Sequence, residues 1–472
     1  MLPRRGIASA SATIGSGLNF VQVKQRLAFL KTLVLGQDAT SSLRSRAVHS
    51  GAWIGAGFAV QKVLQLGSNL ILTRLLFPEA FGLMALATVF LVGLAMFSDI
   101  GLKPAVIRDP RGDDPEFLNT AWTIQVARGL LLCVIGVAIA YPLSLIYEQP
   151  ILFPLLAVLS TTAAINGFTS IGLVTAERRL DFRTLTVVQI VGQIASIALL
   201  IALAYSLKSV WALAAGNVLS SALTIGLGHV VLQGHRHRFQ LDPKAARSLV
   251  QFGKWIFLST IVTFVGGEGL RAIQAGFLTP AEFGVLAIAY TIAAIPIELS
   301  MKLTSTIGLP AFSEALRDDA SKLSGILHQF RKRVLAFSFV LVAVVAFTSE
   351  NLVAVLYDDR YHAAGAFVVA ITLSNAVALI VLGYNNALLA LGKSSTYLWT
   401  MTFSTAGRII GIIAGFQVSG ILGMIVGVGV ANIITLLIVW PIMYRLRLLD
   451  IKLDLAMLSS IAVLTVSLVL LT

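Results

Sequence analysis

Residues 51–87 read GAWIGAGFAVQKVLQLGSNLILTRLLFPEAFGLMALA, and this stretch decides the fold because it returns further along the chain. Residues 253–289 read GKWIFLSTIVTFVGGEGLRAIQAGFLTPAEFGVLAIA and align with it without a gap. The identities include Gly51/Gly253, Trp53/Trp255, Val60/Val262, Gly67/Gly269, Ile71/Ile273, Leu76/Leu278, Pro78/Pro280, Phe81/Phe283, Gly82/Gly284, Ala85/Ala287 and Ala87/Ala289. A chain this apolar would give roughly four identities by chance. The pattern therefore predicts a duplicated helical unit.

Composition places these units in a membrane. The chain is 57% hydrophobic and 12% charged, and it carries successive apolar runs of about twenty residues, the length at which a helix crosses a bilayer. Its single cysteine, Cys133, lies in such a run, which excludes an intrachain disulfide and a thiolate metal site. We predict thirteen spans at 51–73, 79–98, 118–140, 151–173, 185–205, 209–232, 253–277, 282–306, 334–352, 363–390, 397–417, 420–444 and 454–471.

The distribution of basic residues orients these spans. Of the 35 lysines and arginines, 28 fall in the N-terminal tail and in the connectors on one side of the membrane. Three fall on the other side (Arg74, Lys208 and Arg360), and four lie away from the ends of the spans, deeper in the membrane. Cytoplasmic segments carry such an excess of cations, so we predict a cytoplasmic N-terminus. The net charge of +13 thus reflects topology, and we exclude nucleic acid as a partner.

Six spans separate the first helix from the seventh, so both enter the membrane from the same side and the repeat is parallel. The predicted organisation is a basic cytoplasmic tail (1–50), an N-lobe of helices 1–6 (51–232), a cytoplasmic linker (233–252), a C-lobe of helices 7–12 (253–444) and an extra C-terminal helix (445–472). Transporters built from repeats bind substrate between them. We therefore predict an all-α, polytopic fold of two six-helix lobes around a central cavity.

Two stretches outside the spans are amphipathic. In the tail, Phe20, Val23, Leu27, Leu30 and Val34 recur at helical spacing with cations off that face. This pattern suits a helix on anionic membrane lipids, although a disordered leader accounts for it equally well. The stretch 310–333 also gathers apolar residues on one face and predicts an interfacial helix leading into the ninth span.

A polar stripe runs along the first span. Lys62, Gln65 and Asn69 are spaced i, i+3 and i+7 and share one face of the helix. Lys62 lies roughly 16 Å from either end of the span, and a charge at that depth costs roughly 2.5–3.5 kcal/mol on insertion scales. We therefore expect this face to line a water-filled cavity.

Three arginines lie at similar depth. Arg128 and Arg408 lie near the middle of the third and eleventh spans, and Arg271 lies in the outer half of the seventh. Each could instead pair with a helix carbonyl or a carboxylate to fix packing. For the set that alternative weakens because carboxylates are few, and Glu268, one turn from Arg271, is the obvious local partner.

The seventh span contains a weak point. Gly266, Gly267 and Gly269 each lower helix stability by about 1 kcal/mol relative to alanine, so the helix can bend there, although close helix packing also uses such glycines. In the next span, Pro296 precedes Glu298 and predicts a kink with a carboxylate beside it. Glu268, Glu298 and Asp99 are candidates for proton or sodium coupling.

Several runs carry a family resemblance. They are LTRLLFPEAFG (72–82), FSDIGL (97–102), AERRLDFR (176–183), VWAL (210–213), LPAFS (309–313) and LALGK (389–393). In order and spacing they resemble the polysaccharide-transporter branch of the multidrug/oligosaccharidyl-lipid/polysaccharide exporter superfamily. Many relatives carry fourteen helices, one more than predicted here.

The resemblance implies two lobes in a V that flip undecaprenyl-diphosphate-linked oligosaccharide, or export polysaccharide, across the bacterial inner membrane. It implies a lipid-linked oligosaccharide as substrate, polymerase and glycosyltransferases of the same pathway as partners, and no cofactor. Relatives use cavity arginines for the diphosphate. We assign that role to Lys62, Arg128, Arg271 and Arg408 from their depth alone, with Gln65 and Asn69 contacting sugars.

Two other functions compete with this one. A cation-coupled drug exporter of the same superfamily would need carboxylates to outnumber bases within the membrane, whereas here bases outnumber carboxylates. A membrane glycosyltransferase or polymerase would need catalytic acids. The paired acids Asp113–Asp114 and Asp358–Asp359 lie in hydrophilic connectors, where turns and solvated charge explain them. Scattered histidines make a metal site improbable.

Overall fold

The computed structural model of this chain describes residues 43–98, 102–109, 111–179, 181–231, 238–246, 249, 260–261, 263–304, 312 and 323–471. Every regular element within these ranges is a helix. Much of the predicted tail (1–50) and linker (233–252), and Asp99, lie outside the described residues. The predicted domain boundaries therefore stay predictions.

The helices follow one another along the chain with short connections. The first half forms α2 (Leu43–Leu75), α3 (Pro78–Phe97), α4 (Leu102–Arg108), α5 (Pro115–Ile146), α6 (Leu152–Gly167), α7 (Gly172–Arg178), α8 (Phe182–Leu207) and α9 (Val210–Val231). The second half forms the π-helix η1 (Val265–Gly269), α11 (Leu270–Ala275), α12 (Pro280–Leu303), α14 (Leu323–Leu356), the 3-10 helix η4 (Asp359–Tyr361), α15 (Ala363–Ala390), α16 (Ser394–Arg445) and α17 (Ile451–Leu471).

Local sequence fixes where several helices begin. α3 and α12 start at Pro78 and Pro280, equivalent residues of the repeat, because proline favours the first helical turn. Thr279 and Glu282 form a capping box at the start of α12. Asp114 caps α5 by accepting a hydrogen bond from the Glu116 N–H.

Each of the thirteen predicted spans overlaps one of these helices. Nine helices of the described part are long and apolar enough to cross a membrane, or ten if α6 and α7 form one broken span. α16 counts once among them but contains two helices, because Ser419 and Gly420 leave helical geometry between predicted spans eleven and twelve. The chain is therefore a multi-pass membrane protein.

The fourth span differs from the prediction. We expected one helix over 151–173, but α6 ends at Gly167 and α7 continues from Gly172 after a bend of 58°. Just before this bend α6 packs closely against α5. Glycine at position 129 of α5 allows this contact, since a Cβ there would lie 2.6 Å from the Ala163 carbonyl oxygen of α6.

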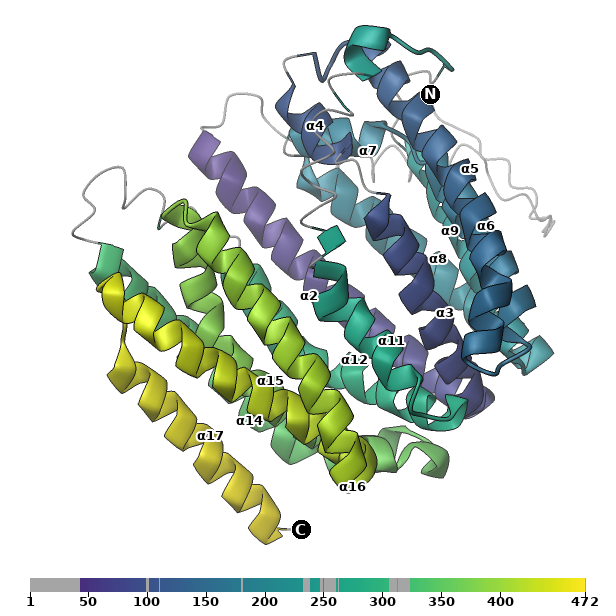
Figure 1. The fold of residues 1–472 in the computed structure, drawn as a ribbon. Helices are drawn as coiled ribbons and strands as arrows, with labels where there is room; N and C mark the ends of the chain where they lie inside the picture. The colour runs from purple at the N-terminus through teal and green to yellow at the C-terminus, as the bar shows by residue number, and fades with distance from the viewer. Residues whose placement is uncertain are drawn as a thin grey trace, which may run out of the picture.

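The helices form two bundles (Figure 1). In the first, α5 packs on α6, α8 on α9 and α2 on α8; in the second, α15 contacts α12, α14 and α16. The two legs of α16 meet through glycines, and a Cβ on Gly411 would lie 2.3 Å from the Gly427 carbonyl oxygen. Small residues of this kind allow close backbone approach inside a membrane. The observed fold is the predicted pair of six-helix lobes with an added C-terminal helix.

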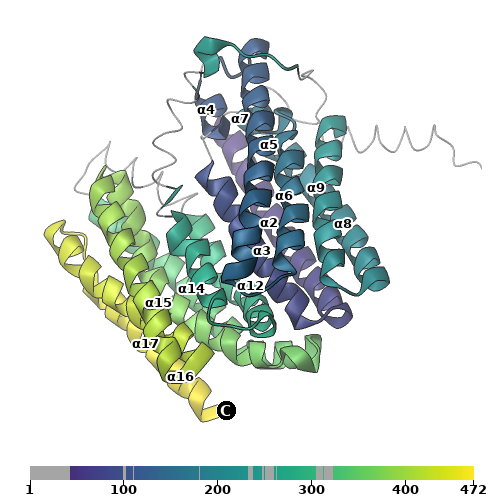
Figure 2. The same ribbon diagram turned by 45° about the vertical axis from the view of Figure 1, so that its right-hand side comes forward.

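The lobes join where α3 crosses α12. A Cβ on Gly82 would lie 1.8 Å from the Pro280 carbonyl oxygen, and one on Gly284 would lie 1.9 Å from the Pro78 carbonyl oxygen. These mutual contacts are symmetric under the repeat. They lie at the helix ends that the predicted topology places outside, and away from this crossing the two bundles diverge, as the turned view shows (Figure 2).

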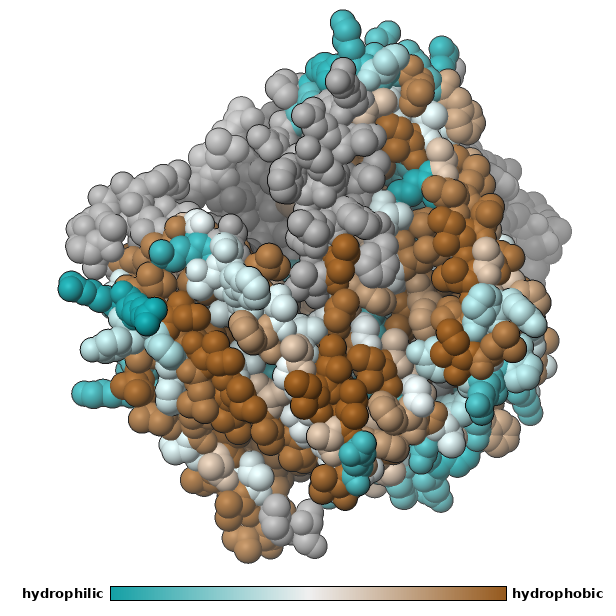
Figure 3. All heavy atoms as spheres, in the orientation of Figure 1, coloured by the Kyte–Doolittle hydropathy of each residue, from teal (hydrophilic) through white to brown (hydrophobic). Residues whose placement is uncertain are grey.

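The outer surface is that of a membrane protein (Figure 3). Apolar side chains cover the described face of the molecule between more polar ends. On α5, for example, Leu131, Val134 and Leu145 are exposed. Large exposed apolar areas on a folded chain mark contact with another apolar phase, here the lipid.

The ninth helix also differs from the prediction. Of the stretch 310–333 that we predicted as an interfacial helix, residues 310–311 and 313–322 lie outside the described residues, and residues 323–333 belong to α14, which runs without a break from Leu323 to Leu356. Phe312, Leu323 and Leu327 are buried in the core of the C-lobe. The apolar face of the first turns of α14 is therefore covered by protein, because α15 and α17 pack against α14.

Candidate substrate site within the membrane

Lys62 does not stand alone on its polar stripe. Its Nζ lies 2.5 Å from the Glu298 Oε2 of α12, so an ion pair joins the two lobes. From the sequence, Glu268 was the obvious local carboxylate for a buried cation, whereas Lys62 pairs with a second carboxylate, Glu298. Glu298 was missed as a partner because it belongs to the other lobe, more than 200 residues away in the sequence.

Aromatic and amide groups surround this pair. The Lys62 Nζ also donates a hydrogen bond to Gln65 at 3.3 Å, and lies 5.7 Å from the centre of the Phe58 ring. Lys302, one turn beyond Glu298, places its Nζ 5.4 Å from the same ring. Asn69, further along the stripe, is half-buried.

The predicted weak point of the seventh span is a π-helix, η1, formed by Val265–Gly269. π-helices are rare and frequently mark functional sites. Glu268 accepts hydrogen bonds from Arg271 at 3.4 Å, as predicted for neighbours one turn apart. The Arg271 guanidinium lies 5.4 Å from the ring centre of Tyr290 on α12.

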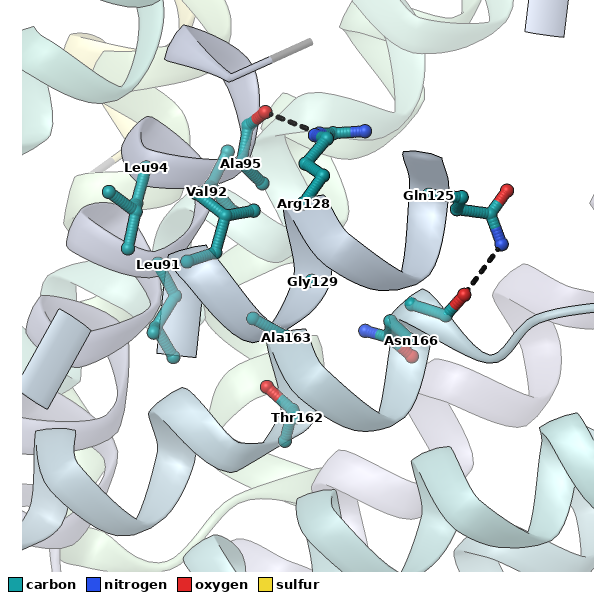
Figure 4. A pocket seen from close by; sticks show the side chains of 12 residues that line it. Leu91, Val92, Leu94, Ala95, Gln125, Arg128, Gly129, Thr162, Ala163 and Asn166 are labelled. Atoms are coloured by element: carbon teal, nitrogen blue, oxygen red, sulfur yellow. Dashed lines mark hydrogen bonds between the residues drawn. The ribbon is translucent and has the colours of Figure 1, made fainter. Parts of the chain in front are cut away.

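Arg128 borders a pocket of about 260 Å³ among α3, α5 and α6 (Figure 4). Its Nε donates to the Ser98 Oγ at 2.9 Å and its Nη2 to the Ala95 carbonyl oxygen at 2.8 Å. The lining combines polar side chains with leucines: Gln125, Thr162 and Asn166 with Leu91, Leu94 and Leu132.

Arg408 borders a smaller pocket, of about 90 Å³, in the C-lobe. Its Nε donates to the Asn432 Oδ1 at 2.9 Å, and the Asn432 amide donates to the Ser374 carbonyl oxygen. Asn385, Ser404, Thr405 and Thr435 also line this pocket, together with Gly266 of η1. Both pockets exceed the 10–15 Å³ or so that one water molecule requires.

The four predicted cations thus occupy separate settings. Arg128 and Arg408 line two different pockets, one in each lobe, while Lys62 and Arg271 each contact a carboxylate. Between them, Gly93 of α3 packs against Phe264, the residue before η1. The assignment of these residues to substrate stays a prediction.

The paired acids of the connectors hold local structure. Asp113 accepts hydrogen bonds from Arg179 and Arg178, and the hydrogen bond from Arg179 lowers the pKa of Asp113 below its ordinary value. Asp358 caps η4 and accepts a hydrogen bond from the Arg360 side chain at 2.7 Å. Both sites show the turn and charge roles expected from the sequence.

The sequence is similar to those of known polysaccharide biosynthesis proteins. The model of a family described as polysaccharide biosynthesis protein matches residues 71–366. The lipopolysaccharide biosynthesis protein WzxC of Escherichia coli (strain K12) is 19% identical over 86% of this chain and 82% of its own length. The succinoglycan biosynthesis transport protein ExoT of Rhizobium meliloti (strain 1021) is 24% identical over 52% of this chain and 50% of its own.

Solved structures share the fold. The lipid II flippase MurJ in an inward closed conformation has a TM-score of 0.70 at 14% identity, over 87% of this chain and 91% of that chain. An inward-facing MATE family transporter of the MOP superfamily has a TM-score of 0.64 at 13% identity, over 86% of this chain and 95% of that chain. An outward-facing MATE family transporter has a TM-score of 0.53 at 15% identity, over 90% of this chain and 97% of that chain. Because the family model covers more than half of the sequence, the chain belongs to the family of polysaccharide biosynthesis proteins, and its fold is that of these transporters.

Proposed function

We propose that this protein flips a lipid-linked oligosaccharide, or exports a polysaccharide, across the bacterial inner membrane by alternating access. The observation that carries the proposal is a cation in each lobe at a polar pocket among membrane-spanning helices. These cations are Arg128 and Arg408. The names of WzxC and ExoT, both given for polysaccharide biosynthesis, agree with it.

The chemistry of the pockets suits a glycosylated diphosphate. A guanidinium can bind two phosphate oxygens at once and is weakly hydrated, so it suits phosphate recognition inside a membrane. Amide and hydroxyl side chains beside each arginine can bind sugar hydroxyls. They are Gln125, Thr162 and Asn166 in the N-lobe, and Asn385, Asn432 and Thr435 in the C-lobe.

The movement we propose is a rocking of the lobes. The α3/α12 crossing closes one end of the molecule in this conformation, so it has to open in the other. The π-helix η1 lies beside Arg408's pocket and can absorb bending there. Coupling of this cycle to protons or sodium through Glu268 remains a proposal.

The rival functions are weaker. A MATE drug exporter shares the fold, but a fold by itself does not specify cargo. Arg408 donates a hydrogen bond to the neutral Asn432 Oδ1, which leaves positive charge in its pocket and favours an anionic cargo over a cationic drug. ExoT is named a transport protein, which favours transport over polymerisation.

To test the proposal, Arg128→Ala, Arg271→Ala and Arg408→Ala are expressed singly in a strain that lacks the native gene. A charge-assisted hydrogen bond contributes about 1.5–3 kcal/mol, so loss of one phosphate contact should lower polysaccharide export about tenfold or more. Lys452→Ala, at an exposed cation in the first turn of α17, is the matched control. Normal export by all three variants at wild-type protein levels would refute the proposal.

A further inference from the structure

The Lys62–Glu298 pair spans a gap between two helices of different lobes. α2 and α12 are not among the helix pairs that pack along their length, so long side chains make this contact. The exposed fractions of the two side chains are 21% for Lys62 and 39% for Glu298. A soluble or membrane-bound anion can therefore reach the pair.

The pair lies far from the α3/α12 crossing. Glu298 follows the start of α12 by 18 residues, which corresponds to about 27 Å of helix. Lys62 precedes the end of α2 by 13 residues, or about 20 Å. On the predicted topology Glu298 thus lies near the cytoplasmic end of α12, the side from which cargo enters, and Lys62 reaches it from near the middle of its span.

A second contact of the same kind accompanies the pair. Lys302 of α12 lies over the Phe58 ring of α2, so a cation again meets the opposite lobe. Both contacts use a lysine ammonium, which a phosphate attracts more strongly than an aromatic ring or one carboxylate does. A diphosphate that is esterified at both ends carries about two negative charges in all, one on each phosphate, against one for Glu298.

We propose that the Lys62–Glu298 pair is a closing contact that the cargo itself opens. The inference rests on the proposed function and adds a mechanism of selection to it. A diphosphate headgroup displaces the Glu298 carboxylate from Lys62, α2 separates from α12, and the headgroup enters between the lobes. Neutral lipids lack the charge that displaces Glu298, so they leave the lobes closed.

The test measures the distance between the lobes. Cys133 is replaced by serine, and spin labels are attached to cysteines at Glu116 of α5 and Ser324 of α14, both exposed. The protein is placed in lipid nanodiscs with undecaprenyl diphosphate or with the neutral undecaprenol. The diphosphate should move the distance distribution to longer values, and undecaprenol should leave it unchanged.

Two variants separate the roles of the partners. Glu298→Gln should give the long distances without any added lipid and bind undecaprenyl diphosphate about tenfold more tightly, the factor for a pair closed in about nine molecules of ten. Lys62→Gln should also open but bind more weakly. Lys62→Arg keeps the charge and should stay closed, and Glu350→Gln, at an exposed carboxylate of α14, is the control.

The outcomes distinguish this inference from the proposed function. If the wild type binds the diphosphate and Glu298→Gln matches it in distance and affinity, the pair is no closing contact, although the function stands. If neither the wild type nor any variant binds undecaprenyl diphosphate, the proposed flipping of a lipid-linked oligosaccharide fails as well.

Discussion

Arg331 and Asp454 form the most deeply buried ion pair among the described residues. Their side chains are 2% and 0% exposed, and the Arg331 Nη2 lies 2.6 Å from the Asp454 Oδ1. Tyr384 and Trp440 both donate hydrogen bonds of 2.9 Å to the Asp454 Oδ2. The guanidinium also lies 3.6 Å from the ring centre of Tyr384. This cluster attaches α17 to the C-lobe.

We predict that Arg331→Met lowers the stability of the protein by about 3–5 kcal/mol, because it leaves the Asp454 charge without its partner in the interior. The double variant Arg331→Met/Asp454→Asn should lose less, since neither charge is then left alone. Thermal unfolding of the purified protein measures both. Arg333→Met, at an exposed cation of the same helix, should melt like the wild type. Equal melting of Arg331→Met and Arg333→Met would contradict the prediction.

Among elements, the crossing of α3 and α12 decides which end of the molecule is closed. Tyrosines of each lobe reinforce it: the Tyr147 hydroxyl donates to the Ala272 carbonyl oxygen at 3.1 Å, and the Tyr361 hydroxyl donates to the Leu76 carbonyl oxygen at 3.5 Å. Each tyrosine follows the third helix of its lobe and reaches the opposite lobe. Each lobe therefore contributes one such tyrosine contact to the closed outer end, in agreement with the repeat.

We predict that Gly82→Ala opens this crossing, because the added Cβ would lie 1.8 Å from the Pro280 carbonyl oxygen. Leu278 lines the crevice beside Gly82, so a cysteine there, in a Cys133→Ser background, should react severalfold faster with a membrane-impermeant maleimide. Gly67→Ala is the control, because a Cβ on Gly67 meets nothing within 4 Å. Unchanged labelling in Gly82→Ala would show that the helices adjust without opening.

At the scale of the whole molecule, the asymmetry of basic residues predicts orientation. A cysteine at Lys208, in the turn between α8 and α9, should react with an impermeant maleimide added to intact spheroplasts. A cysteine at Glu116, at the start of α5, should react only after the membrane is made permeable. The opposite pattern would reverse the predicted topology.

The sequence alone determined the architecture. The apolar runs predicted where the helices lie, apart from the break in the fourth span, and the repeat predicted the two lobes, because membrane insertion depends on local hydropathy and on connector charge. The weak point at Gly266–Gly269 was also visible, since glycine spacing acts within one helix, and the structure shows a π-helix there. Depth within the predicted spans likewise marked Lys62, Arg128 and Arg408 as cations that need polar surroundings.

The tertiary structure decided the partners of those cations. Lys62 meets Glu298 across the lobes, and Arg331, which the sequence placed in a connector, meets Asp454 of the last helix. Hydropathy reports how deep a residue lies but not which way its helix face turns or which helix lies opposite. Pairs separated by more than one hundred residues depend on how the bundles pack, and only the folded chain specifies that packing.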